Sequence, residues 1–165
     1  MLTQADLRAQ VETFYSKSLV TSALPSAALQ AVGNYWQNTA RKNKRDWFII
    51  IDCYGGKNSA ITKASNSSSY AFRDSVFLYE LYDRVSSGSY PSDGFSLLNG
   101  WVKSFTDNLK AEQWGMYINY ADTQLSRTEA TSLYYKQNLP RLQQIKAQLD
   151  PNEVFYYPHA VAPAK

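Results

Sequence analysis

The sequence predicts an α+β fold, an antiparallel sheet covered by helices on one face. Segments with strand character and segments with helical periodicity follow one another irregularly, without the steady strand–helix alternation of parallel α/β proteins. No internal repeat divides the 165 residues, and a composition with 44% hydrophobic and 19% charged residues is typical of a globular domain. No stretch of the sequence reaches the roughly 18 apolar residues of a membrane-spanning helix.

Two helices are expected before the first strand of hydrophobic residues. Thr3 and Asp6 stand at capping-box spacing and apolar residues follow at helical intervals, which predicts a helix over 3–16. Pro25 opens a second helix. Its predicted apolar face contains Leu29, Val32 and Trp36, and its end carries Arg41, Lys42, Lys44 and Arg45. Basic side chains at a helix C-terminus complement the helix dipole, and a phosphate-binding patch is the alternative interpretation.

Three segments have strand character. Residues 47–54 are rich in β-branched and aromatic side chains and end at a glycine pair, which predicts a central strand buried on both faces. Residues 76–82 and 114–120 predict two further strands. The glycines after the first of these strands lack the spacing of a phosphate-binding loop, so a nucleoside-triphosphate site is excluded there.

Helical periodicity returns in the second half of the chain. Apolar residues over 95–109 recur at spacings of three and four, which predicts an amphipathic helix whose apolar stripe is core. Ser126 and Glu129 form a capping box that begins the next helix. Pro140 ends that helix and serves as a first-turn residue of the last one, because proline has no amide hydrogen to donate inside a helix.

Charge and cysteine content exclude several classes of site. A net charge of +3 does not indicate nucleic-acid binding, and no leader with a charged and then an apolar region opens the chain. One cysteine, Cys53, and one histidine, His159, exclude an internal disulfide framework, a cysteine metal cage and a multi-histidine metal site. We expect His159 to lie exposed on the surface. The 13 tyrosines suit a ligand cleft or the rim of an ordinary core.

Three places carry groups that could do chemistry. Asp52 ends a strand that we expect to be buried, so its carboxylate is either bonded to the following glycine turn or part of a functional site. Tyr117 and Asn119 point to one side of a strand and Tyr120 to the other, unless the strand ends near Asn119 and Tyr120 joins them. These three side chains could line a sugar or flavin pocket, or be ordinary sheet-face residues. Arg73 and Asp74 form the third place, interpreted as a structural ion pair.

An ordered series of aromatic and polar motifs runs along the chain. In the second half it comprises residues 114–120, Asp122, 134–135, 138–142, 145–146, 150–152 and Phe155. In the first half it comprises residues 13–15, 17–19, Trp47, 52–56, 58–59 and 68–74. The later series resembles the C-terminal segment of berberine-bridge-enzyme-like FAD-linked oxidases. The earlier one resembles the substrate domain of their fungal oligosaccharide-oxidase branch.

The resemblance implies part of a two-domain flavoprotein of the vanillyl-alcohol-oxidase type. In such proteins an N-terminal domain binds FAD, often covalently through a His and a Cys, and a later domain builds an antiparallel sheet over the flavin. Residues 1–125 then correspond to the substrate domain, incomplete at its N-terminus, and 126–165 to a segment that packs on an FAD-binding domain absent from the chain. Neither Cys53 nor His159 stands in a flavin-linkage motif. Secretion is expected from the fungal relatives.

The resemblance also implies a reaction and its residues. The expected reaction is oxidation of an alcohol, such as the anomeric hydroxyl of a carbohydrate, with hydride passing to FAD and then to oxygen. Tyr120 is the expected base, Asp52 its activator, and Tyr117 a contact to substrate or flavin. Asn119 and Asn138 are the further expected cofactor contacts. The isolated chain is expected to be inactive without the FAD-binding domain. The alternatives are a carbohydrate-binding module without redox chemistry and a structural piece of a larger complex.

Overall fold

The computed structural model describes residues 12–63 and 68–165. The strands are β1 (Thr13–Thr21), β2 (Asp46–Cys53), β3 (Phe77–Val85) and β4 (Trp114–Gly115). The α-helices are α1 (Ser26–Asn38), α2 (Ala60–Lys63), α3 (Gly94–Thr106), α4 (Arg127–Tyr135) and α5 (Leu139–Leu149). Short 3-10 turns are η1 (Ala40–Lys42), η2 (Ala111–Gln113) and η3 (Lys136–Asn138).

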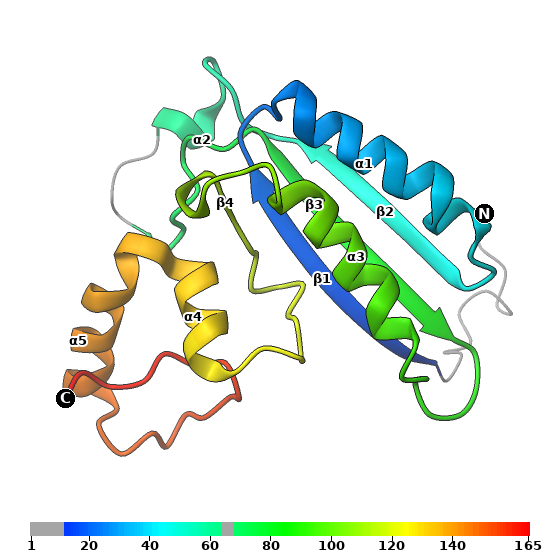
Figure 1. Cartoon of the computed structure of the whole chain (residues 1–165). Coiled ribbons are helices and arrows are strands. Elements are labelled where there is room, and N and C mark those ends of the chain that lie inside the picture. The colour runs from blue at the N-terminus through cyan, green and yellow to red at the C-terminus, as the bar shows by residue number, and fades with distance from the viewer. Residues whose placement is uncertain (1–11, 64–67) are drawn as a thin grey trace, which may run out of the picture.

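The four strands form one antiparallel sheet in the order β2-β3-β1-β4 (Figure 1). Glu80 of β3 lies between Ser18 of β1 and Ile50 of β2. β2 is an edge strand in which most side chains are exposed, so the prediction of a central strand buried on both faces is wrong. A short apolar run does not show by itself how many neighbouring strands it has.

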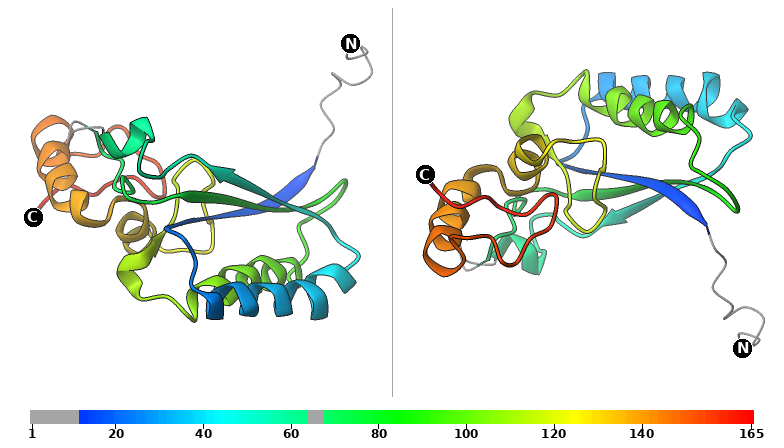
Figure 2. Two further views of the ribbon diagram at one scale, coloured as in Figure 1. Left: turned by 90° about the horizontal axis from the view of Figure 1, so that it is seen from above. Right: turned by 90° about the horizontal axis from the view of Figure 1, so that it is seen from below.

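Helices α1 and α3 lie side by side against one face of the sheet (Figure 2). Alternate strand side chains reach them: the rings of Trp47 and Trp101 are 5.7 Å apart, and those of Tyr79 and Phe105 are 4.7 Å apart. Among the described residues, no helices of comparable length cover the opposite face; the short α2 and the segment after β4 border it. The predicted α+β fold with helices on one face of an antiparallel sheet is confirmed. We call the uncovered side the open face.

The first predicted helix and the third predicted strand need correction. Residues 13–21 form β1, so the helix predicted over 3–16 is wrong at its end, and its residues 3–11 lie outside the described part of the chain. The strand predicted over 114–120 ends at Gly115, because the amide of Met116 donates to the carbonyl of Leu133 in α4 and the chain then turns. In both cases long-range pairing decides the local conformation.

Helix α1 begins after Pro25 as predicted, but only Val32 of its predicted apolar face packs against the core. Leu29 and Trp36 are 56% and 49% exposed, whereas Ala28 is fully buried and Tyr35 packs on Trp101. The helix ends at Asn38, before the basic residues. The helix-dipole interpretation is therefore wrong for Arg45, which instead pairs with the buried Asp83 of β3.

The last three helical elements and the tail pack together beyond β4 (Figure 1). The capping box at Ser126 and Glu129 is confirmed, and Pro140 lies in the first turn of α5 as predicted. His159 is only 5% exposed, so the prediction of a surface histidine is wrong. Its Nδ1 lies 3.4 Å from the hydroxyl of Tyr134 and its Nε2 lies 3.1 Å from the carbonyl of Leu125.

Within residues 12–63 and 68–165, no helix is long and apolar enough to cross a membrane. The same residues contain no group of three or more His, Cys, Asp or Glu side chains that could hold a metal ion.

Candidate active site

The open face carries two carboxylates close together on neighbouring strands. Asp52 of β2 lies opposite Leu78, and Glu80 follows two residues later on β3, so both side chains point to the same face. Diagonal neighbours of this kind are about 7 to 8 Å apart in an antiparallel pair. Two acids on one small area of sheet can serve as proton acceptors for a group placed above them.

Asp52 is exposed, which corrects the expectation of a buried acid. The structural alternative, a carboxylate bonded to the glycine turn, is also wrong for the described residues, because the amides of Tyr54 and Gly55 both donate to the carbonyl of Val76 at 3.1 Å. The position of Asp52 on an edge strand explains both results. Its carboxylate therefore faces solvent beside Glu80.

A turn brings two tyrosines to this face. The amide of Tyr117 donates to Ser18 Oγ at 2.7 Å, and that hydroxyl donates to the carbonyl of Tyr117 at 3.1 Å. The amide of Tyr120 then donates to the carbonyl of Tyr117 at 3.1 Å and closes the turn. Since the strand has ended before this point, strict alternation does not apply. The rings of Tyr117 and Tyr120 lie 5.7 Å apart, as in the alternative in which Tyr120 joins Tyr117.

The phenol of Tyr120 interacts with both acids of the open face. Burial raises its pKa above the ordinary value of 10.0, and the charge of Glu80 and contact with that carboxylate raise it further. The charge of Asp52 acts weakly in the same direction. The phenol is thus protonated at neutral pH, and it must pass its proton to an acceptor before it can take one from a bound hydroxyl group. Glu80, which contacts the phenol, and Asp52, whose charge acts on it more weakly, are the candidate acceptors.

A cavity of about 370 Å³ opens beside these groups. It is lined by Tyr54, Ile61, Tyr70, Arg73, Leu78 and Tyr117. Tyr117 also borders a second hollow of about 250 Å³ together with Asn119, whose side-chain amide donates to the Tyr117 hydroxyl at 2.8 Å. Aromatic walls with a few polar tips are the usual lining of a small-molecule site.

Two other predicted groups lie near the rim of the cavity. Arg73 lies over the ring of Tyr70 and donates to Ser68; among the described residues it forms no ion pair with Asp74, so that prediction is wrong. Asn138 lies in η3, and its amide donates to the carbonyl of Ser69 at 3.1 Å. Ser69 lines the second hollow, so Asn138 touches the site through this residue.

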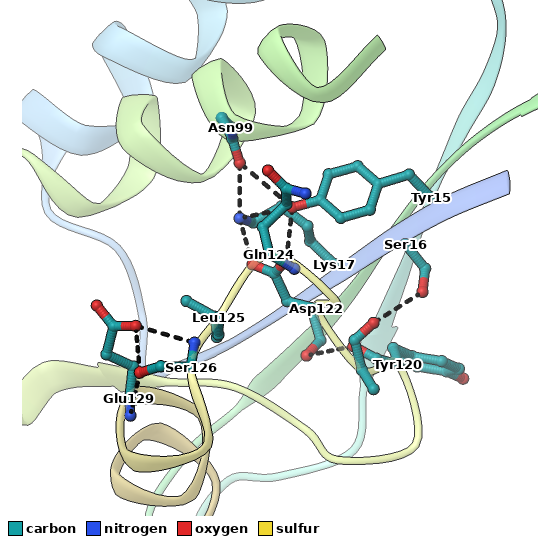
Figure 3. Close-up of polar contacts among 12 residues, drawn as sticks. Tyr15, Ser16, Lys17, Asn99, Tyr120, Asp122, Gln124, Leu125, Ser126 and Glu129 are labelled. Atoms are coloured by element: carbon teal, nitrogen blue, oxygen red, sulfur yellow. Dashed lines mark hydrogen bonds and ion pairs between the residues drawn. The ribbon is translucent and has the colours of Figure 1, made fainter. Parts of the chain in front are cut away.

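Two features of the site were not predicted from the sequence. One is Glu80, whose only local signal is a charged residue at an alternating position of a strand. The other is a buried ion pair, in which Lys17 Nζ lies 2.5 Å from Asp122 Oδ2 although 105 positions separate the residues (Figure 3). The Tyr15 hydroxyl donates to Asp122 Oδ1 at 2.5 Å. These contacts hold the segment that carries Tyr117 and Tyr120.

Comparison with known proteins finds the family that the sequence motifs resemble. The family model described as berberine and berberine like matches residues 116–162, the segment that includes the tyrosine turn. The chain is 61% identical over 160 residues to a xylooligosaccharide oxidase of Thermothelomyces thermophilus and 45% identical over 158 residues to a carbohydrate oxidase of Microdochium nivale. The chain is a relative of the berberine-bridge-like oxidases. Each alignment covers 94% of this chain and 32% of the relative.

Solved structures show the same likeness in three dimensions. The structure superposes on a xylooligosaccharide oxidase from Myceliophthora thermophila C1 in complex with xylobiose with a TM-score of 0.90. It superposes on a glucooligosaccharide oxidase of Acremonium strictum, which carries a 6-S-cysteinyl, 8α-N1-histidyl FAD, with a TM-score of 0.85 and 39% identity. These superpositions cover 95% and 93% of this chain and 34% of each oxidase. The chain therefore spans about a third of the length of these oxidases.

Proposed function

We propose that this chain is the substrate-domain portion of an FAD-dependent oxidase that oxidises an alcohol, such as the anomeric hydroxyl of an oligosaccharide, with oxygen as the final acceptor. The observation that carries the proposal is the phenol of Tyr120, which interacts with Glu80 and Asp52 on the open face of the sheet. The names of the oligosaccharide oxidases related to this chain support the substrate class.

The residues of the open face support proton removal from a bound hydroxyl. Tyr120 accepts the hydroxyl proton on its oxygen as its own proton passes to a carboxylate, Asp52 or Glu80. The raised pKa of Tyr120 makes this transfer necessary, because the free phenolate is scarce at neutral pH. Proton removal pushes electrons toward the carbon–oxygen bond, so the carbon that carries the hydroxyl can release a hydride and become a carbonyl carbon.

The open face also suits the flat ring of FAD. The cavity beside Tyr120 has tyrosine walls and the cationic Arg73 at its rim, a donor set that fits a planar, electron-poor ring with carbonyl oxygens. Tyr117 and Asn119 would contact the ring, and Asn138 would support that wall through Ser69. FAD, when bound, supplies the hydride acceptor and delivers the electrons to oxygen.

The test replaces the matching third of the xylooligosaccharide oxidase with this chain, so that the remaining two thirds come from a relative of 61% identity. Peroxide release with xylooligosaccharides and glucooligosaccharides measures the reaction. We expect turnover in the graft, and a fall of about 10²- to 10⁴-fold in kcat in Tyr120→Phe, the range of a lost general base. A graft that binds FAD but releases no peroxide would refute the proposed function.

Further variants assign the roles. Asp52→Asn and Glu80→Gln remove the two acceptors one at a time, and the larger loss in kcat identifies the main one. Tyr156→Phe is the matched control, because Tyr156 is 66% exposed in the tail. Full activity in Tyr120→Phe would show that another group is the base.

A further inference from the structure

We propose that the buried Lys17–Asp122 ion pair determines the position of the Tyr120 phenol. We further propose that the pair contributes little to the net stability of the fold. This inference deepens the proposed function and rests on it for its catalytic meaning. Neither Lys17 nor Asp122 lines the cavity or the second hollow, so both are positioning residues.

The segment after β4 crosses from one face of the sheet to the other around the edge of β1. Ser16 and Ser18 point to the open face and bond the backbone at Ala121 and Tyr117. Lys17, between these serines, points to the helix face and pairs with Asp122. Successive residues of β1 therefore bind the segment on both faces of the sheet. Tyr120 lies between Tyr117, which is bound on the open face, and Asp122, which is bound on the helix face.

The Lys17–Asp122 pair on the helix face has further hydrogen bonds, and both charged groups are shielded from water. Asp122 is fully buried and Lys17 is 6% exposed. Lys17 Nζ also donates to Asn99 Oδ1 of α3 at 2.7 Å, and Asp122 Oδ1 also accepts from the amide of Gln124 at 3.0 Å (Figure 3). The ion pair thus joins the tyrosine segment to β1 and α3 at the same time.

Helix α4 of the C-terminal segment also binds Asp122. The amide of Asp122 donates to the Tyr134 hydroxyl of α4 at 3.2 Å, and that hydroxyl lies against His159. Asp122 is therefore held through both its carboxylate and its backbone. Tyr120, two residues earlier, has little freedom to shift along β1.

The energy of a buried ion pair indicates that Lys17 and Asp122 position Tyr120 more than they stabilise the fold. Removing two charges from water costs about as much as their attraction returns, and apolar side chains of similar volume are often equally stabilising in such places. Apolar contacts have no preferred direction, whereas the bonds of Lys17 and Asp122 reach particular atoms on β1, α3 and α4. A catalytic group displaced by about 1 Å can lose about 100-fold in rate. Accurate placement of Tyr120 is therefore what this ion pair supplies.

The test removes the charges together and replaces them with apolar side chains. The triple variant Lys17→Met, Asp122→Leu and Tyr15→Phe leaves no charge unpaired. The matched control is Lys103→Met with Asp107→Leu, which removes an exposed pair on the outer side of α3. In the 165-residue chain, thermal unfolding measures stability, and ¹³C-labelled tyrosine NMR, assigned with Tyr120→Phe, measures the position and titration of the Tyr120 phenol.

We expect an unfolding midpoint within about 4 °C of the parent. We also expect a shifted Tyr120 signal and a Tyr120 pKa lowered toward 10, because the phenol moves away from Glu80. In the oxidase graft, kcat should fall about 100-fold with little change in KM. An unchanged Tyr120 signal would overturn the proposal, and so would a large loss of stability, because the pair would then be structural. Since the NMR measurement needs no turnover, an inactive graft would refute only the proposed function.

Discussion

We expect the fold to be sensitive to substitution of Asp83, which lies at the centre of a buried charge cluster. Asp83 is fully buried in β3, and Arg45 Nε lies 3.0 and 2.9 Å from its two carboxylate oxygens. The Tyr90 hydroxyl donates to the same carboxylate. Burial and then this bond with Asp83 raise the pKa of Tyr90, so its hydroxyl remains a donor at any ordinary pH. The substitution Asp83→Asn keeps the shape of the side chain and removes its charge.

The expected loss follows from the environment of Arg45. Breaking a buried ion pair costs about 3 to 5 kcal/mol, because the remaining charge is left without compensation. The Arg45 side chain is 14% exposed and lies 3.5 Å from the exposed Asp93, so water and a second carboxylate compensate it in part. We therefore expect a loss near the lower limit, about 3 kcal/mol. For a chain of this size this corresponds to about 6 to 12 °C in the unfolding midpoint.

Urea unfolding followed by circular dichroism measures this loss. The midpoint should fall while the slope m stays unchanged, because stability falls and the surface exposed on unfolding does not change. The control is Asp107→Asn, which breaks the exposed Lys103–Asp107 pair and should cost less than about 1 kcal/mol. A loss below about 1 kcal/mol in Asp83→Asn would refute the reasoning that Asp83 is the counter-charge of Arg45.

Two other predictions concern the turn after β2 and the C-terminal segment. Gly55→Ala should cost about 1 to 3 kcal/mol in urea unfolding, because its Cβ would lie 1.8 Å from the carbonyl oxygen of Ser75. Gly33→Ala in α1, where a Cβ meets nothing, should instead stabilise the chain by about 1 kcal/mol, and equal effects would contradict the argument. Lys146 holds the pKa of Asp150 below its ordinary value of 3.8, so the stability that Asp150 contributes is present above that value and is lost as the pH falls below it. The protection factors of the Val154 and Phe155 amides, which donate to this carboxylate, should fall in acid in the parent but show no such titration in Asp150→Asn.

Local patterns in the sequence predicted most of the regular elements. The strand at 47–54, the strand at 76–82 and the helix at 95–109 correspond to β2, β3 and α3. The capping box at Ser126 and the helix start at Pro140 are equally local signals. Each of these features depends on residues within one or two turns of each other, so a single sequence contains the needed information.

The errors all involve contacts between distant parts of the chain. β2 was predicted to be central because its side chains are apolar, but its place at the edge of the sheet depends on which strands pair. His159 was predicted to be exposed because it is a lone polar residue in a tail, but α4 covers it through Tyr134. The exposure of Asp52 has the same origin, since an edge strand has one free side.

The sequence by itself determined the type of most elements, the tyrosine turn as the place to look for chemistry, and the related family, because these depend on short stretches of residues in a characteristic order. Only the tertiary structure decided that Glu80 lies beside Tyr120 and that Lys17 meets Asp122. The physical reason is that strand register and the crossing of a segment around a sheet edge are determined by the packing of the whole chain, and a one-residue change in register would turn Glu80 to the opposite face.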